Sequence, residues 1–291
     1  MKKLVMVIFL ISGSAAYAEG LEITVNSQNL YQGQVLKIES SHRKQNRFRV
    51  RFNKREYQSY LFDNKQIILI GIDYQLKPST YAITGSYKRT TNIYIPLSWK
   101  IKVIEKYPKQ TYVPSKRKPE VQKRINEESA KKKEVFSAPS ERKNKMDEFV
   151  RPIIPSYITG AFGNKRCTER KGNKFFNCQY HLGTDYRAAF DEKHFKAEAI
   201  KSIGDGKVIL IDSYLMDGKI VVIDHGNGIT SGYLHLSKTF VKAGVSVKTG
   251  QKIGMAGHTG ATRAIHLHLF LKMDNGKTTV DPEYFLKSVI K

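Results

Sequence analysis

The sequence HLHLFL, from His266 to Leu271, alternates imidazoles and leucines before it becomes fully apolar. Side chains of a β-strand point to opposite faces in turn, so a strand here places His266 and His268 on one face and Leu267 in a core. Strand-like runs also cover residues 207–211 and 220–223, with glycines between them. Residues 151–291 are therefore predicted to form a mostly antiparallel β-domain with tight turns.

Two more segments of this domain carry possible metal ligands: HLGTD, from His181 to Asp185, and YLH, from Tyr233 to His235. A strand or loop with even spacing places His181 and Asp185 on one side. Imidazole nitrogen and carboxylate oxygen suit zinc, and three protein ligands leave one coordination position for water. The pattern predicts one catalytic Zn²⁺ site per chain. We interpret the isolated histidines as surface or core residues: His42, His194, His225 and His258.

Residues 1–18 are typical of a secretory signal peptide. Lys2 and Lys3 precede an apolar run, and Ala16-Tyr17-Ala18 matches a small-x-small cleavage site. An N-terminal anchor or a buried helix is the alternative, although the run is short for a membrane span. We expect an exported protein, periplasmic or secreted, with no transmembrane anchor in the mature chain.

Cys167 and Cys178 are the two cysteines of the chain. An even pair in an exported protein favours one disulfide, which would contribute about 2–3 kcal/mol. Zinc-binding thiols are the alternative, but a complete His/Asp set is present without them.

The formal net charge is +24. Such a charge raises the question of nucleic-acid binding, but no nucleic-acid motif is present and the basic residues are spread along the chain. We expect no nucleic-acid partner and instead adhesion to an anionic envelope surface, weakening as salt rises. A role in solubility alone is the alternative.

Two further regions precede the C-terminal domain. Residues 19–105 contain short alternating runs separated by turn residues, which predicts a small β-sandwich-like domain. Residues 106–150 are punctuated by prolines and contain the run Lys131-Lys132-Lys133. They predict a basic linker with a short polar helix at 120–134, a solvated charge run, and a path across the C-terminal domain.

The ordered motifs closely resemble the lysostaphin-type zinc endopeptidases of bacterial cell walls, peptidase family M23. The resemblance covers about residues 158–285 and rests on HLGTD, HLH and the segments FG (162–163), GDGKVI (204–209), VVIDHGNGITSGYLHLS (221–237) and GQKIGMAGHTG (250–260). A looser likeness links QGQVLKIE (32–39) and LIGIDYQLKPSTYAI (69–83) to the β-rich region that precedes this peptidase in many envelope members.

The resemblance implies that His181, Asp185 and His268 bind zinc and that His235 and His266 are the catalytic histidines. Zinc lowers the pKa of its water and polarises the scissile carbonyl. The site has no HExxH glutamate, so an unligated histidine must handle protons. We assign the general base to His235 and water orientation with oxyanion stabilisation to His266; the reverse assignment stays open.

We therefore expect an exported, monomeric zinc metallo-endopeptidase that hydrolyses peptide cross-links of peptidoglycan. The resemblance implies D,D-endopeptidase action on D-alanyl–diaminopimelate bridges. A non-catalytic wall-binding regulator of other peptidoglycan hydrolases is the alternative. Arg263, Ala264-Ile265 and residues 190–197 depart from the family pattern and bear on the shape of the groove. A further hypothesis is that the N-terminal region or the linker blocks the groove.

Overall fold

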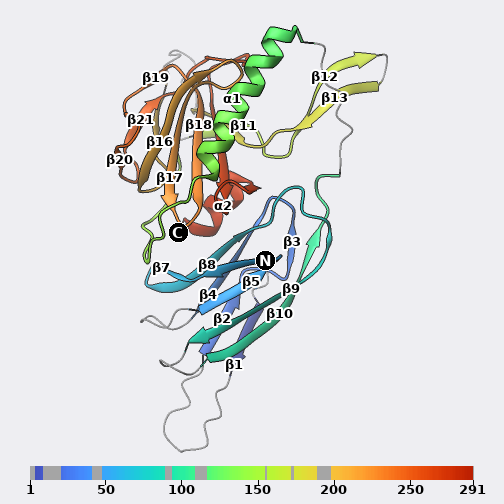
Figure 1. The fold of residues 1–291 in the computed structure, drawn as a ribbon, viewed down its shortest axis with the longest axis vertical. Helices are drawn as coiled ribbons and strands as arrows, with labels where there is room; N and C mark the ends of the chain where they lie inside the picture. The colour runs from blue at the N-terminus through green and yellow to red at the C-terminus, as the bar shows by residue number, and fades with distance from the viewer. Residues whose placement is uncertain are drawn as a thin grey trace, which may run out of the picture. The chain divides into compact units, whose positions relative to one another are not determined.

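The computed structural model describes residues 4–8, 21–40, 48–88, 94–108, 117–154, 156–171, 174–188 and 198–290. The chain divides into two units. One comprises Met1–Lys106 with Lys143–Asp147, and the other comprises Tyr107–Arg142 with Glu148–Lys291. Both units consist mainly of β-strands (Figure 1), so the predicted fold class is confirmed.

The N-terminal unit contains two five-stranded sheets. One has the order β1-β2-β4-β8-β7 (Leu4–Ile8, Leu21–Val25, Val35–Ser40, Lys65–Gly71, Tyr60–Phe62), and the other has the order β3-β10-β9-β5-β6 (Asn29–Tyr31, Tyr94–Ile104, Ser79–Lys88, Phe48–Phe52, Arg55–Gln58). Strand β5 buries Phe48, Val50 and Phe52 and exposes the arginines between them. These side chains join residues of the other sheet, such as Ile68, in one core that also holds Trp99. Alternation of this kind produces a β-sandwich.

Strand β1 lies in the segment that the sequence predicts to be a signal peptide. It pairs antiparallel with β2, from Leu4 opposite Val25 to Ile8 opposite Leu21. A short apolar run suits both roles, because a strand of a sandwich and the apolar part of a signal peptide have similar composition. The predicted cleavage site lies outside the described residues. Cleavage there would remove β1 and leave β2 at the edge of its sheet.

The C-terminal unit is organised around an eight-stranded sheet in which every pairing is antiparallel. Its path is β11-β14-β22-β18-β17-β16-β20 (Ser156–Gly160, Thr184–Ala188, Leu267–Met273, Ile229–Leu236, Gly218–Gly226, Gly206–Tyr214, Ser246–Val247), and β23 (Thr278–Val280) pairs with β22. A smaller sheet contains β15, β21 and β19 (Ala199–Lys201, Lys252–Met255, Lys238–Thr239). The predicted antiparallel β-domain is therefore present.

A separate hairpin joins β12 and β13 (Lys165–Lys171 and Lys174–Tyr180). Cys167 and Cys178 lie opposite each other in it and form the disulfide that the sequence favours. The alternative of zinc-binding thiols is thereby excluded.

Helix α1 (Pro119–Ser137) contains the predicted polar helix but belongs to the C-terminal unit. Phe136 is buried and packs edge-on against Phe270 of β22, within a cluster that includes Leu234. Lys131 and Lys132 form ion pairs with Asp212 and Asp217. Lys131 remains exposed, as expected for a solvated charge run, whereas Lys132 is largely covered beside Asp217, so the expectation was wrong for Lys132.

Helix α2 (Pro282–Val289) was not predicted. Asp281 caps it by accepting hydrogen bonds from the backbone amides of Glu283 and Tyr284, and Pro282 occupies the first turn. The dipeptide Asp281-Pro282 is a recognisable helix start. Neither helix in the described part of the chain is long and apolar enough to cross a membrane.

Candidate metal centre

Adjacent strands bring the predicted ligands together. Asp185 of β14 lies opposite His268 of β22 in the antiparallel register, and His181 precedes β14. Leu267 and Leu269 are fully buried on the other face of β22, as the alternation predicts. The backbone at Gly183 packs closely against the ring of His268, and a Cβ atom at this position would clash with Nε2 of that ring. A larger residue there would push this imidazole out of place.

Three donor atoms converge on one point. Nδ1 of His268 lies 2.9 Å from Nε2 of His181 and 2.8 Å from Oδ1 of Asp185, and that Oδ1 lies 3.0 Å from Nε2 of His181. Nδ1 of His181 donates to the carbonyl oxygen of Ala161 at 3.0 Å, so a neutral ring carries its lone pair on Nε2. Lone pairs so close together repel unless a cation or a proton lies between them. The set therefore fits a metal of the zinc type.

Asp185 is held in its ionised form. Burial raises its pKa, but the contacts with the imidazoles of His181 and His268 outweigh burial and hold the pKa far below its usual range. Its second oxygen, Oδ2, accepts a hydrogen bond from Arg166 at 2.5 Å. Sequence reasoning missed Arg166, and only its place beside Cys167 in the hairpin could have drawn attention to it.

His235 reaches the site because the backbone of β18 is irregular there. The residue has a φ of +62°, and the pairing of β17 with β18 shifts register between Lys219 and Val221, which lie opposite Leu236 and Tyr233. Non-glycine residues seldom adopt this conformation outside special sites. Its Nδ1 donates to the carbonyl oxygen of Thr259 at 2.9 Å. Burial lowers the pKa of His235 to about 4, so the ring is neutral at neutral pH.

His266 completes the cluster from the residue before β22. Its Nδ1 lies 2.9 Å from the carbonyl oxygen of Ala264 and 3.2 Å from Oγ1 of Thr262. Its Nε2 lies 3.6 Å from Oδ1 of Asp185, and its ring centre is 4.9 Å from that of His235. The structure thus brings together all five residues that the sequence singled out.

The other histidines and Tyr233 lie apart from this chemistry. Tyr233 is fully buried and its hydroxyl accepts a hydrogen bond from the amide of Ile203, which is a packing role. His225 is buried between the carbonyl oxygen of Asp205 and the hydroxyl of Ser231. His258 is exposed. His42, His194 and residues 190–197 lie outside the described residues.

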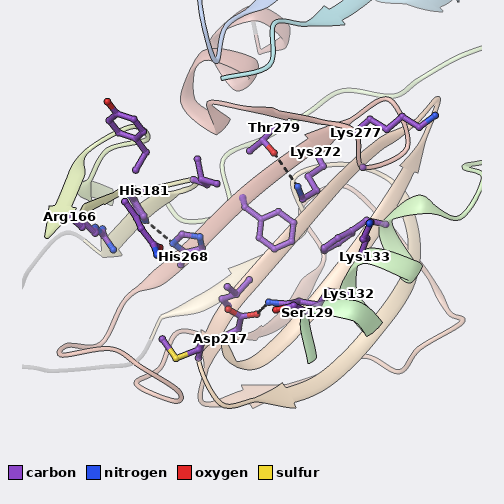
Figure 2. Close-up of a pocket in the computed structure, with 18 of the residues that line it drawn as sticks. Ser129, Lys132, Lys133, Arg166, His181, Asp217, His268, Lys272, Lys277 and Thr279 are labelled. Carbon is purple, nitrogen blue, oxygen red and sulfur yellow. Dashed lines mark hydrogen bonds and ion pairs between the residues drawn. The ribbon is translucent and has the colours of Figure 1, made fainter. Parts of the chain in front are cut away.

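A cavity of about 910 Å³ extends from the metal centre along the sheet. Figure 2 shows His181, His268 and Arg166 at one end and basic side chains at the other. Helix α1 forms one wall through Lys132, Lys133 and Phe136. The helix that the sequence placed in a linker therefore shapes the space beside the predicted site.

Known proteins match this part of the chain. Residues 179–282 match the model of peptidase family M23, so the resemblance found in the sequence is confirmed. Peptidoglycan DD-endopeptidase ShyB of Vibrio cholerae is 39% identical over 126 residues, which are 43% of this chain and 27% of ShyB. Lysostaphin of Staphylococcus simulans is 40% identical over 94 residues, which are 31% of this chain and 19% of lysostaphin.

One solved structure shares the fold over most of the chain. A protein of Pseudomonas aeruginosa described as a peptidase M23 superposes with a TM-score of 0.56 at 23% identity, covering 88% of this chain and 94% of its own. In contrast, the chain aligns with only about a quarter of the length of ShyB. Residues 179–282, which match the family model, lie within the C-terminal unit.

Proposed function

Because residues 179–282 form a peptidase family M23 domain, we propose that this chain is an exported zinc metallo-endopeptidase that hydrolyses peptide cross-links of peptidoglycan. One observation carries the proposal: three donor atoms converge on one point beside His235 and His266, which are not needed to hold a metal. The name of the relative ShyB, a peptidoglycan DD-endopeptidase, supports the substrate class.

His181, Asp185 and His268 would hold the zinc through Nε2, Oδ1 and Nδ1. When bound, zinc supplies Lewis acidity, which lowers the pKa of a water ligand and polarises the scissile carbonyl. Two of these proposed ligands are oriented by residues that would not touch the metal. The carbonyl oxygen of Ala161 accepts a hydrogen bond from the His181 ring, and Arg166 donates one to Oδ2 of Asp185. Such outer contacts set the tautomer and direction of metal ligands.

The two remaining histidines would share the proton chemistry. The bond from His235 to Thr259 places the proton on Nδ1, so Nε2 is free to accept a proton from the attacking water. The low pKa of His235 keeps that nitrogen unprotonated at neutral pH. His266, whose Nε2 lies 3.6 Å from Oδ1 of Asp185, would orient the water and stabilise the developing oxyanion.

We propose D-alanyl–diaminopimelate bridges as the bond that is cut. The V. cholerae relatives are named DD-endopeptidases, whereas a Staphylococcus capitis relative of similar identity is named a glycyl-glycine endopeptidase. The predicted signal peptide and the disulfide fit an oxidising compartment such as a periplasm. The charge of +24 suits adhesion to anionic envelope polymers. We also propose that the mature protein is a monomer.

The test uses mature protein, Glu19–Lys291, with zinc and two kinds of intact sacculi: one with D-alanyl–diaminopimelate bridges and one with glycyl bridges. Mass spectrometry identifies the released muropeptides. We expect loss of cross-linked dimers from the first kind alone, and none with excess chelator. Full hydrolysis in chelator would rule out zinc catalysis, and release from glycyl bridges alone would reassign the bond. No cleavage of either, with zinc bound, would favour the wall-binding regulator.

A further inference from the structure

The cavity beside the metal centre carries more positive charge than the proposed chemistry uses. Six basic side chains line it against one carboxylate, that of Asp217: Arg117, Lys132, Lys133, Arg166, Lys272 and Lys277. Lys132 pairs with Asp217, and Arg166 pairs with Asp185. Neither Lys133 nor Lys277 has a carboxylate partner among the described residues. These charges remain to be explained.

The basic end lies at a definite place relative to the metal centre. His268, Phe270 and Lys272 are alternate residues of β22 and therefore share one face of the sheet. Lys272 lies four steps along the strand from His268, which is about 13 Å at about 3.3 Å per residue. Figure 2 shows Lys272, Lys277 and Lys133 at the end of the cavity away from His181 and His268.

Three different segments supply these ammonium groups. Lys133 comes from α1, Lys272 from β22, and Lys277 from the turn that leads to β23. Lys272 donates to the hydroxyl of Thr279 at 3.1 Å, and its Nζ lies 5.7 Å from the centre of the Phe136 ring. All three lysines line the same end of the cavity beside an apolar floor, so their positive charges favour an anion bound at that end.

The floor between the two ends is apolar. Phe270, Phe136 and Leu234 line the cavity and belong to one buried cluster. A ligand that fits this space has an uncharged middle and a negative group at one end. An extended peptide of about four residues with a free carboxylate has that character and that length.

We propose that Lys133, Lys272 and Lys277 form a carboxylate subsite, which binds an acidic group of the substrate peptide about 13 Å from the scissile bond. Helix α1 is then a wall of the substrate site, since it supplies Lys133. The subsite rests on the proposed function and deepens it, because it favours stem peptides with free carboxylates over amidated or all-glycine peptides.

The test measures binding apart from turnover. An uncross-linked stem tetrapeptide has no bridge to hydrolyse, and its free-acid and side-chain-amidated forms are titrated calorimetrically into the full zinc-loaded chain. We expect the free acid to bind at least fivefold more tightly than the amide. The double variant Lys133→Gln/Lys277→Gln should weaken binding of the acid about tenfold and change that of the amide less than twofold.

Two further variants make the comparison specific. Lys133→Arg/Lys277→Arg should retain the preference, and Lys252→Gln, an exposed lysine on β21 that does not line the cavity, should bind both peptides as the parent does. Equal binding of acid and amide by the parent, or equal losses for both in the double glutamine variant, would overturn the subsite. Peptide preference without hydrolysis of sacculi would instead overturn only the proposed function.

Discussion

The Nδ1 nitrogen of His235 donates to the carbonyl oxygen of Thr259 at 2.9 Å, and the residue that makes this bond has a φ of +62°. The bond assigns the proton of the neutral ring to Nδ1, because a carbonyl oxygen only accepts. The unusual backbone turns the ring toward His266 and His268. Together they present one unprotonated nitrogen to the metal centre.

Replacing His235 by alanine should therefore separate catalysis from metal binding. We expect His235→Ala to keep one zinc per chain and to lose about 10²–10⁴-fold in kcat, the usual contribution of a positioned base. Metal analysis by mass spectrometry and muropeptide release measure the two properties. The matched control is His258→Ala, since His258 is exposed and outside the cluster. Turnover by His235→Ala within threefold of the parent would remove the base assignment.

Asp185 should instead be required for the metal itself. A ligand that binds only the folded state at a thousand times its Kd stabilises that state by about 4 kcal/mol. We expect zinc to raise the melting temperature of the parent but not of Asp185→Asn. Asp212→Asn, which removes the surface carboxylate paired with Lys131, should keep the zinc-dependent rise. A full rise in Asp185→Asn would show that the metal binds elsewhere.

Phe136 should anchor α1 to the sheet. Phe136→Ala removes a buried ring from its contact with Phe270, and such truncations cost about 3–5 kcal/mol. The measurement is unfolding in urea, in which the hydrogen exchange of peptides from residues 206–273 reports the unfolded fraction of the C-terminal unit. Phe240→Ala is the control, because Phe240 is 45% exposed and should lose less than about 1 kcal/mol. A cost below 1 kcal/mol for Phe136→Ala would mean that α1 is only loosely attached.

The pH dependence of stability should reveal how much the ionised carboxylate of Glu283 stabilises the fold. Burial raises its pKa, but hydrogen bonds from Arg151 and Tyr186 outweigh burial, so the net shift is downward. A carboxyl whose pKa is lower in the folded state stabilises the fold above its unfolded pKa, about 4.3 for Glu. This stabilisation is lost as the pH falls below that value.

The variant Glu283→Gln has no carboxylate to ionise and so lacks this stabilisation. Its melting temperature should therefore be well below that of the parent at pH 7. The gap should narrow as the pH falls from about 5 toward 3. Glu127→Gln, an exposed change on α1, should follow the parent at every pH. A gap that stays constant between pH 7 and pH 3 would exclude an ionised Glu283 as the cause.

The sequence sufficed to predict the strand position of the proposed zinc ligand His268. Alternation places His268 on one face of β22 and Leu267 in the core, because strand geometry leaves little choice. The same alternation predicts that His235 shares a face with Tyr233, and this prediction is wrong: Tyr233 is buried in the core, whereas His235 lies beside His266 and His268. The positive φ of His235 depends on the register shift against β17 and on Thr259, both of which are set by tertiary structure.

A path of this segment across the C-terminal domain was predicted, but the contacts of α1 could not be read from its sequence for a related reason. Its residues favour a helix, and the helix was predicted, but Phe136 is the one buried side chain that it contributes. One apolar contact gives no periodic pattern, so the packing against Phe270 and the ion pairs of Lys131 and Lys132 were not foreseen. Helix α2 was different, since its Asp281-Pro282 start was visible in the sequence.

Trp99 is the single tryptophan of the chain, and it lies in the core of the N-terminal sandwich. Its emission therefore reports the melting of that unit and is silent on the peptidase domain, whose near-ultraviolet signal comes from tyrosine and phenylalanine. The chain thus carries a built-in optical probe for one of its two units. Comparing tryptophan emission with backbone circular dichroism during unfolding would show, without labels or truncation, whether the two units lose structure together or in separate steps.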